Sequence, residues 1–323
     1  MNVAANLRVP REPAAAAAGG LTPLQRREGG LMRFAVAITV LNLLGHLWLG
    51  FEQSWATPFV SLAAAYATEL ACASAAAAAD GRRPRFAESF GALVRFLLSA
   101  HITGLAVGML LYAAEQLWVV AFASGFAIAS KHLIRMDLGG GLIRHVYNPS
   151  NIGIAVTLVL FPWVGIAPPY QFAENLFGAL DWLLPLVVVT TGTLINRKFT
   201  QRLPLIGAWL GGFAAQAIMR SLVNETPLLA GLAPMTGFAF ILFTFYMITD
   251  PATTPEGKRA QLCFGLSVAL AYGLLMEFHI VFGLFFALAL ASTLRAATVL
   301  LRRGLPGTAR AACSPDVATV HVG

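Results

Sequence analysis

The stretch from Leu228 to Pro255, LLAGLAPMTGFAFILFTFYMITDPATTP, indicates what kind of protein this chain is. Its first part, from Leu228 to Ile248, is an apolar run of the length that a helix needs to cross a bilayer core, about 20 residues. The run ends in a carboxylate, three hydroxyl groups and two prolines between Thr249 and Pro255. Membrane insertion requires no such cluster, and backbone that leaves a helix at that place must find polar partners. The cluster is therefore a candidate site at the end of a predicted membrane span.

Runs of this kind recur along the chain. Of its 323 residues, 58% are hydrophobic and 11% are charged, and the mean hydropathy is +0.72, which excludes an ordinary soluble globule. We count ten apolar runs, which extend approximately from Leu31 to Phe51, Trp55 to Ala79, Gly91 to Ala113, Leu117 to Ser130, Ile152 to Ala167, Phe177 to Ile195, Leu203 to Leu222, Leu228 to Ile248, Leu262 to Met276 and Ile280 to Leu301. We predict an all-α polytopic membrane protein with about ten transmembrane helices, surrounded by the lipid bilayer.

The basic residues indicate how these spans are oriented. The formal net charge is +7, but Lys and Arg stand at span ends instead of gathering among aromatic residues on one face, which argues against a nucleic acid partner. Every second loop is basic, whereas the loops between them carry Glu52, Glu115, Glu174 and Glu277. The positive-inside rule therefore places both termini on the cytoplasmic side.

No soluble domain fits between the spans, because the longest internal break runs only from Lys131 to Asn151. We expect a disordered cytoplasmic arm over residues 1–30, a transmembrane domain over residues 31–303 and a disordered cytoplasmic tail over residues 304–323. The three cysteines lack Cys-x-x-Cys spacing, and no two histidines are expected to face each other at one depth. We therefore expect no iron–sulfur cluster, no haem and no other metal in this chain.

Two polar breaks with prolines interrupt the apolar pattern, both on the expected cytoplasmic side. The first, Asn148-Pro149-Ser150-Asn151, precedes the fifth run, and helix capping by Ser150 or Asn151 would explain it. Before it stands Gly139-Gly140-Gly141, which fits neither a Rossmann nor a P-loop pattern and is interpreted as a flexible turn.

The second break runs from Thr249 to Pro255. Capping of the ninth helix by Thr253 or Thr254, with Pro255 in its first turn, explains part of this break. Asp250 is left without an explanation. A helix cap and a ligand site are therefore both open here.

Taken together, these motifs resemble a known family. Ser130-Lys131-His132, the glycine run and Tyr147-Asn148-Pro149-Ser150-Asn151-Ile152-Gly153 are followed later by Met247-Ile248-Thr249-Asp250-Pro251-Ala252-Thr253-Thr254. This series is similar to the NqrB/RnfD family, whose patterns are a Lys followed by Gly-rich sequence and Asn-Pro-x-x-x-Gly, and later Met-Ala-Thr-Asp-Pro-x-[ST]-[SA]. Its members are membrane subunits of the sodium-pumping NADH:quinone oxidoreductase and of the Rnf electron transport complex. The resemblance extends from about Leu31 to Leu301 and includes the count of ten helices.

The resemblance implies a flavin-binding, ion-translocating electron-transfer subunit of a larger complex in the bacterial cell membrane. The family attaches FMN to a Thr in a Ser-Gly-Ala-Thr motif that does not occur here, so riboflavin or FMN would be held without a covalent bond. The residues expected to hold the polar groups of the flavin or an ion are Thr249, Asp250, Thr253, Thr254, Asn148, Ser150 and Asn151. Lys131 and Arg144 would balance a phosphate.

The segments Val40 to His46 and Gly50 to Trp55 look most like an offshoot of the family encoded in enediyne-antibiotic biosynthetic clusters of actinobacteria. Electron supply to a biosynthetic pathway and export of a product are both open. Membrane redox subunits and biosynthetic enzymes are thus both candidate partners.

Two ionisable residues stand near the middle of predicted spans, where a charge is costly and often marks a pathway or a buried pair. Glu69 lies ten residues before the end of the second span, and His101 ten residues after the start of the third. They are candidates for an intramembrane relay, in which they could pair. The alternative is one structural hydrogen bond between adjacent helices.

Two other classes of function compete with electron transfer. A transporter or channel with the same fold would move a small solute or a hydrophobic product and would be colourless. A cofactor-free scaffold would anchor biosynthetic enzymes.

Overall fold

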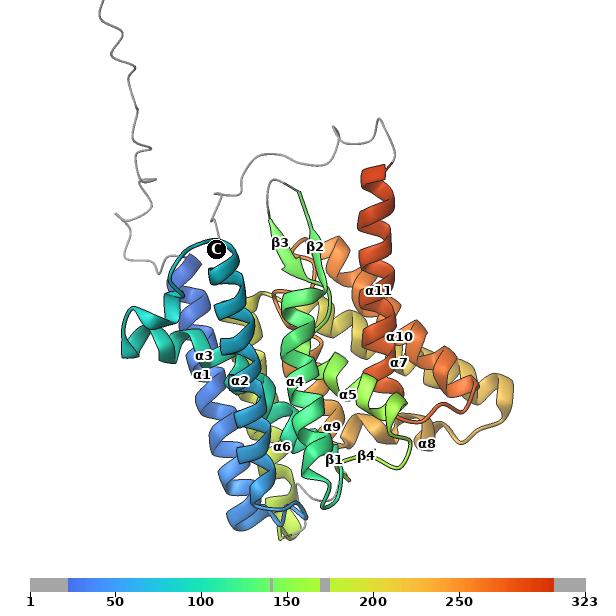
Figure 1. Cartoon of the computed structure of the whole chain (residues 1–323). Helices are drawn as coiled ribbons and strands as arrows, with labels where there is room; N and C mark the ends of the chain where they lie inside the picture. The colour runs from blue at the N-terminus through green and yellow to red at the C-terminus, as the bar shows by residue number, and fades with distance from the viewer. Residues whose placement is uncertain (1–22, 140–141, 169–174, 305–323) are drawn as a thin grey trace, which may run out of the picture.

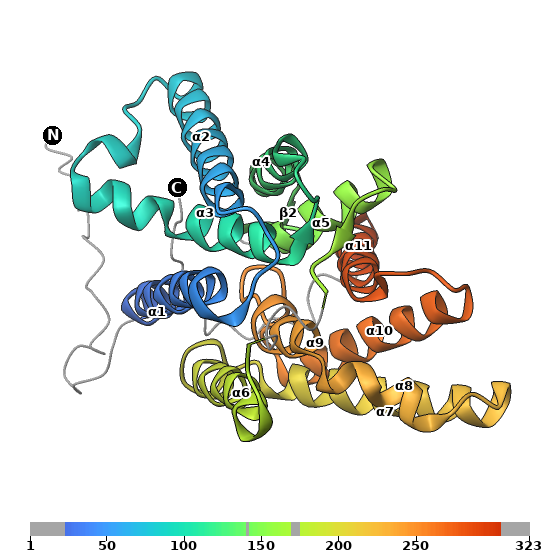
Figure 2. The ribbon, with the colours of Figure 1, turned by 90° about the horizontal axis from the view of Figure 1, so that it is seen from below.

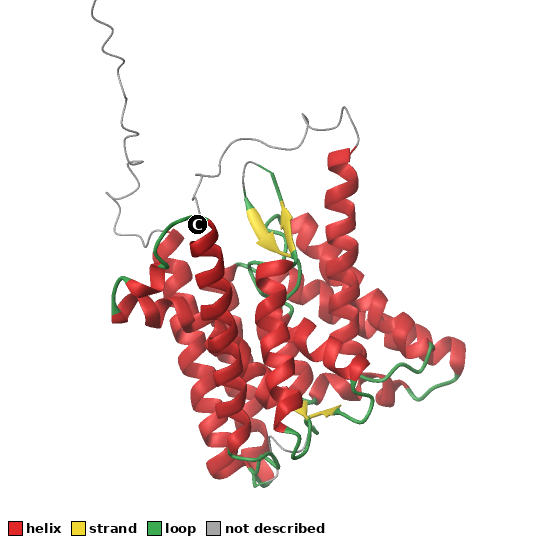
Figure 3. Cartoon of the chain, in the orientation of Figure 1, coloured by secondary structure: helices red, strands yellow, loops and turns green. Residues whose placement is uncertain are grey.

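The computed structural model describes residues 23–139, 142–168 and 175–304, which are mainly helical (Figures 1 and 3). The longer helices are α1 (Pro23–Leu44), α2 (Ala56–Ala79), α3 (Phe90–Leu110), α4 (Leu117–Leu133), α5 (Pro149–Leu160), α6 (Leu183–Ile195), α7 (Leu203–Asn224), α10 (Lys258–Glu277) and α11 (Gly283–Gly304). The π-helical turns η2 (Gly45–Leu49) and η6 (Asn196–Thr200) continue α1 and α6. Between α7 and α10 lie α8 (Leu228–Leu232), η7 (Ala233–Thr236), α9 (Phe238–Leu242) and the π-helical turn η8 (Phe243–Met247).

Two short antiparallel ribbons mark opposite ends of the molecule. The ribbon of β2 (Arg135–Asp137) and β3 (Ile143–His145) lies at the upper end in Figure 1, and β1 (Leu111–Tyr112) pairs with β4 (Gly165–Ile166) at the lower end. We call these the hairpin end and the ribbon end. The sequence did not predict the β2–β3 hairpin, in which Gly139 has a φ of +107° that glycine adopts most readily.

All ten predicted runs contain helix, but their predicted count as membrane spans is not confirmed. Within the described residues, six helices are long and apolar enough to cross a membrane, or seven if the bent pair Leu228–Thr236 with Phe238–Met247 is counted as one span. The helices α4, α5 and α6 are shorter. With 12 residues α5 is about 18 Å long, too short for a bilayer core of about 30 Å. The all-α polytopic class is confirmed.

The helices form two groups that meet at α5. Helices α1 to α4 lie on one side and α7 to α11 on the other, and α5 packs against α3, α4 and α11 (Figure 2). Small residues bring the backbones together, as expected where apolar burial alone does not hold helices to one another. A Cβ on Gly153 would stand 2.6 Å from Ala123 O, and one on Gly265 would stand 2.7 Å from Leu205 O.

The structure corrects the predicted end of the disordered N-terminal arm. Residues 23–30, assigned to the disordered arm, form the start of α1. The rest of the predicted arm and the tail after Gly304 lie outside the described residues.

Candidate functional site

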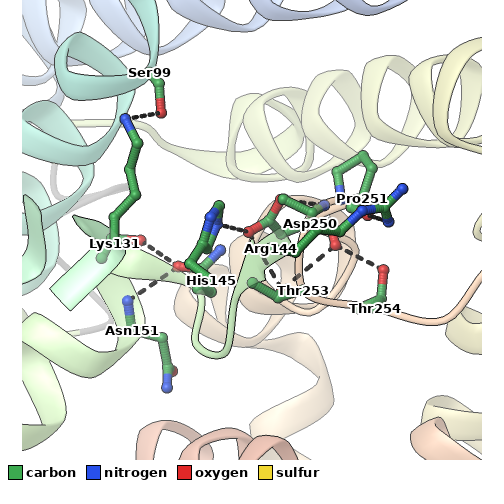
Figure 4. Close-up of polar contacts among 12 residues, drawn as sticks. Ser99, Lys131, Arg144, His145, Asn151, Asp250, Pro251, Thr253 and Thr254 are labelled. Atoms are coloured by element: carbon green, nitrogen blue, oxygen red, sulfur yellow. Dashed lines mark hydrogen bonds and ion pairs between the residues drawn. The ribbon is translucent and has the colours of Figure 1, made fainter. Parts of the chain in front are cut away.

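The two polar breaks of the sequence meet in space near the hairpin end. We call the segment from Arg144 to Asn151, together with the loop from Thr249 to Glu256, the two-loop cluster (Figure 4). Arg144 on β3 donates to Pro251 O at 3.1 Å and to Glu256 Oε1 at 2.7 Å. Asn148 Nδ2 donates to Met247 O at 3.2 Å. The prediction that both breaks contribute to one place is therefore supported by direct contacts.

Asp250 organises the second loop from inside. Its carboxylate accepts from Ala252 N at 3.0 Å and from Thr253 Oγ1 at 3.2 Å, while Thr254 Oγ1 donates to Asp250 O at 2.6 Å. Burial alone would raise the pKa of Asp250, but His145, whose Nε2 lies 3.7 Å from Oδ2, and these donors outweigh burial and lower the pKa. Asp250 is thus a carboxylate held ionised in a largely enclosed loop.

The capping interpretation of the second loop was wrong. Helix α10 begins at Lys258 after Gly257, which makes no side-chain cap, so neither Thr253 nor Thr254 caps it. Both threonines are 3% exposed or less and bind Asp250 instead. Thr249 donates to Phe245 O at 2.8 Å and ties the loop to η8.

Three arginines from separate elements converge on this loop. Besides Arg144, Arg202 before α7 donates through Nε to Thr254 Oγ1 at 2.8 Å, and Arg295 of α11 donates to Thr253 O at 2.6 Å. Arg202 is 4% exposed, and burial lowers its pKa, with the repulsion of Arg144 acting in the same direction. Three guanidinium groups face two carboxylates, those of Asp250 and Glu256, so the cluster carries an excess of positive charge suited to an anion.

The first loop forms the start of α5. Asn148 is its cap, because Asn148 Oδ1 accepts from Asn151 N at 3.1 Å, which corrects the expectation that Ser150 or Asn151 caps this helix. Ser150 Oγ donates to the same oxygen at 2.9 Å. Asn151 is 1% exposed; its Nδ2 donates to Phe285 O at 3.0 Å, but its Oδ1 is buried without a hydrogen-bond partner. A buried acceptor of this kind calls for a donor that the described chain does not supply.

Comparison with known proteins gives one consistent relationship. No protein-family model matches the chain. It is 24% identical over 248 residues to the RnfD subunit of the ion-translocating oxidoreductase complex of Cronobacter sakazakii, an alignment that covers 56% of this chain and 69% of that protein. The proteins of the same name from Salmonella paratyphi A and Salmonella heidelberg are 36% identical over 90 residues, which cover 26% of this chain and 24% of theirs. The chain is similar to these RnfD subunits.

The predicted resemblance to the NqrB/RnfD family is thereby confirmed, and the apolar helices agree with a multi-pass inner-membrane protein. The RnfD-like chain matches only about a quarter of the length of the Salmonella relatives. The side on which its termini lie stays a prediction.

Two expectations about charged residues in this RnfD-like chain were wrong. Lys131 does not belong to the two-loop cluster: Figure 4 shows its side chain pointing away from Asp250 and toward Ser99. Lys131 Nζ donates to the two carboxylate oxygens of Glu69 at 2.8 and 2.9 Å and to Ser99 Oγ at 3.4 Å. It joins α4 to α2 through a buried ion pair, since Glu69 is 2% exposed.

Glu69 and His101 do not pair with each other. His101 binds Tyr66 at 2.6 Å through Nδ1 and Thr39 at 2.7 Å through Nε2. Besides Lys131, Glu69 has His132 Nε2 at 3.4 Å, an ion-pair distance without hydrogen-bond geometry. The relay candidates thus belong to two separate groups within the α1–α4 bundle.

Proposed function

We propose that this RnfD-like protein is a membrane electron-transfer subunit that binds riboflavin or FMN non-covalently in the two-loop cluster. The names of its relatives, subunits of an ion-translocating oxidoreductase complex, support membership of a larger redox assembly. The observation that carries the flavin proposal is the buried oxygen of Asn151, which lacks a donor in a cluster with excess positive charge.

The residues of the cluster fit the chemical groups of a flavin. An isoalloxazine ring carries one imide N–H, which matches the orphaned acceptor of Asn151. Arginines of the cluster match a phosphate, because a guanidinium group binds phosphate oxygens with two parallel donors. Phosphate binding favours FMN over riboflavin. A bound flavin would supply one- and two-electron transfer, and the protein's part is to bind, orient and shield it.

Contacts within the described chain support such an orienting role. Asp250 fixes the second loop through its contacts with Ala252 N and Thr253, and Asn148 ties the first loop to Met247 O, shortly before the second loop. Arg144 then bridges the two loops.

The test begins with the purified full-length protein in mild detergent, whose visible spectrum and flavin fluorescence after denaturation are recorded. Asn151→Leu is expected to remove the flavin, and so is the double variant Asp250→Ala with Thr253→Ala. Arg202→Gln is expected to weaken FMN binding more than riboflavin binding, whereas the exposed Arg82→Gln is the matched control that leaves both unchanged. Wild-type protein that neither copurifies with flavin nor binds added FMN would refute the proposal.

The same preparation separates the competing functions. A transporter would be colourless and would carry solute into liposomes without an electron donor, and a scaffold would show neither colour nor flux. The assignment to enediyne biosynthesis stays a prediction from sequence resemblance.

A further inference from the structure

A stripe of polar side chains runs along the interface between α1 and α3, apart from the two-loop cluster. Thr39, Asn42 and His46 are spaced i, i+3 and i+7, so they lie on one face of α1 and its continuation η2. That face packs on α3, where Thr39 meets His101 and Asn42 Nδ2 lies 3.9 Å from Met109 Sδ. Polar side chains between membrane helices need hydrogen-bond partners, so the donors and acceptors of this stripe can be traced one by one.

The hydrogen bonds around His101 fix where its proton lies. Thr39 Oγ1 donates its hydrogen to Ala35 O at 2.7 Å, so it can only accept from His101 Nε2. Nε2 therefore carries the hydrogen of the neutral ring, and Nδ1 accepts from the Tyr66 hydroxyl at 2.6 Å. The result is a directed chain from Tyr66 on α2 through His101 on α3 to Thr39 on α1.

The stripe continues toward the ribbon end with three buried atoms that have no partner among the described residues. Asn42 and Gln53 use their amide nitrogens on backbone carbonyls, Ile38 O at 2.9 Å and Leu111 O at 3.2 Å, which leaves their oxygens Oδ1 and Oε1 unpartnered. His46 Nδ1 faces Asn42 O at 3.0 Å and so carries the hydrogen, which leaves Nε2 as an unpartnered acceptor.

All three orphaned atoms are acceptors, so what is missing beside them is a donor. A buried polar atom without a partner destabilises the fold, and three such atoms in one stretch indicate bound water or a proton-bearing species. Water has the donors that these atoms need, and buried water is a regular part of protein structure.

The stripe ends at a polar cavity at the ribbon end. Glu52, Ser54, Tyr112, Glu115 and Gln116 line it. Glu52 adjoins Gln53, and Tyr112 adjoins Leu111, whose carbonyl binds Gln53. Two carboxylates at this opening favour cations over anions.

We propose that Tyr66, His101, Thr39, Asn42, His46 and Gln53, completed by water, form a proton path along the α1–α3 interface that opens into this cavity. In each passage the Tyr66 hydroxyl gives its proton to His101 Nδ1 and takes one back from a hydronium ion, while His101 Nε2 releases its proton to Thr39 Oγ1, whose own hydroxyl hydrogen moves to water. A turn of the imidazole ring then restores the first hydrogen-bond pattern, so the net change is one proton carried past His101. Beyond Thr39 the proton moves through water held by the unpartnered acceptors of Asn42, His46 and Gln53. This path is independent of the proposed flavin site.

The experiment measures proton flux through the full chain in vesicles of phosphatidylethanolamine and phosphatidylglycerol. The vesicles enclose the pH dye pyranine, and a potassium gradient with valinomycin drives protons inward. His101→Gln keeps hydrogen-bonding groups but cannot accept a proton at one atom and release one at another; Thr39→Val keeps the shape of threonine without its hydroxyl. The exposed His279→Gln is the matched control.

Vesicles with wild-type protein are expected to acidify faster than protein-free vesicles. His279→Gln is expected to match wild type, whereas His101→Gln and Thr39→Val are expected to lose the added proton flux. Size-exclusion profiles and helical circular dichroism equal to wild type show that the variants are folded. Wild-type flux no greater than that of protein-free vesicles overturns the proposal, as does undiminished flux in both His101→Gln and Thr39→Val. Sodium uptake without acidification, measured with a sodium dye, also overturns it.

Discussion

The buried ion pair between α2 and α4 allows a quantitative test of the packing. Lys131 Nζ lies 2.8 and 2.9 Å from the carboxylate oxygens of Glu69, which is 2% exposed. Removing one partner of a buried pair leaves an uncompensated charge, at a cost of about 3–5 kcal/mol. Lys131→Met keeps the length of the side chain and is expected to lower the free energy of unfolding by about 3–5 kcal/mol.

The double variant Glu69→Gln with Lys131→Met removes both charges and separates charge from packing. Its free energy of unfolding is expected to return to within about 1 kcal/mol of wild type, since replacing a whole buried pair is often nearly neutral. Unfolding by SDS in mixed micelles, followed by circular dichroism, gives the three values, and the exposed Lys258→Met is the control. The reasoning fails if the double variant is as unstable as Lys131→Met or if Lys131→Met unfolds like wild type.

Three further predictions follow from single contacts, each measured as the free energy of unfolding. The folded pKa of Asp250 is below its unfolded value, so its carboxylate stabilises the fold above the unfolded pKa, and this stability is lost as the pH falls through the folded pKa. The difference in free energy of unfolding between wild type and Asp250→Asn should therefore shrink below about pH 4. A difference that stays constant with pH would contradict this prediction. Gly153→Ala should lower the free energy of unfolding by about 1–3 kcal/mol, because its Cβ would stand 2.6 Å from Ala123 O. The control Gly207→Ala, whose Cβ would have no atom within 4 Å, should not lower it. Equal effects of the two variants would refute the close packing of α5 on α4. Asn148→Ala should cost about 1–2 kcal/mol through loss of the α5 cap, and a neutral result would exclude the cap.

The sequence was sufficient where residue type or run length decides the structure. The ten apolar runs located every α-helix in the described part of the chain, because the bilayer favours long apolar helices. The break from Asn148 to Asn151 marked the start of α5, although the cap is Asn148 and not the predicted Ser150 or Asn151. The motifs around Asn148 and Asp250 also indicated the resemblance to the NqrB/RnfD family.

The sequence alone did not predict which side chains contact one another between helices. Lys131 was interpreted as a span-end charge, whereas its partner Glu69 lies 62 residues earlier on α2. Arg202 was also interpreted as a span-end charge, whereas it binds Thr254. Arg295 stands inside the last apolar run, and a charge in that position was a signal for a buried partner that could have been used. Contacts of this kind depend on helix rotation and packing, which the apolar pattern of one sequence does not fix.

The length of α5 explains why the cluster exists at all. A helix of 12 residues cannot span the membrane, so its first turn begins within the protein and its free N–H groups have no water to bind. Asn148 satisfies one of them, and the positive end of the helix dipole adds to the charge of the arginines. The β2–β3 hairpin brings the chain back from the end of α4 to this buried start and carries Arg144 and His145 to the loop of Asp250. The half-length helix, the hairpin and the enclosed carboxylate thus depend on one another.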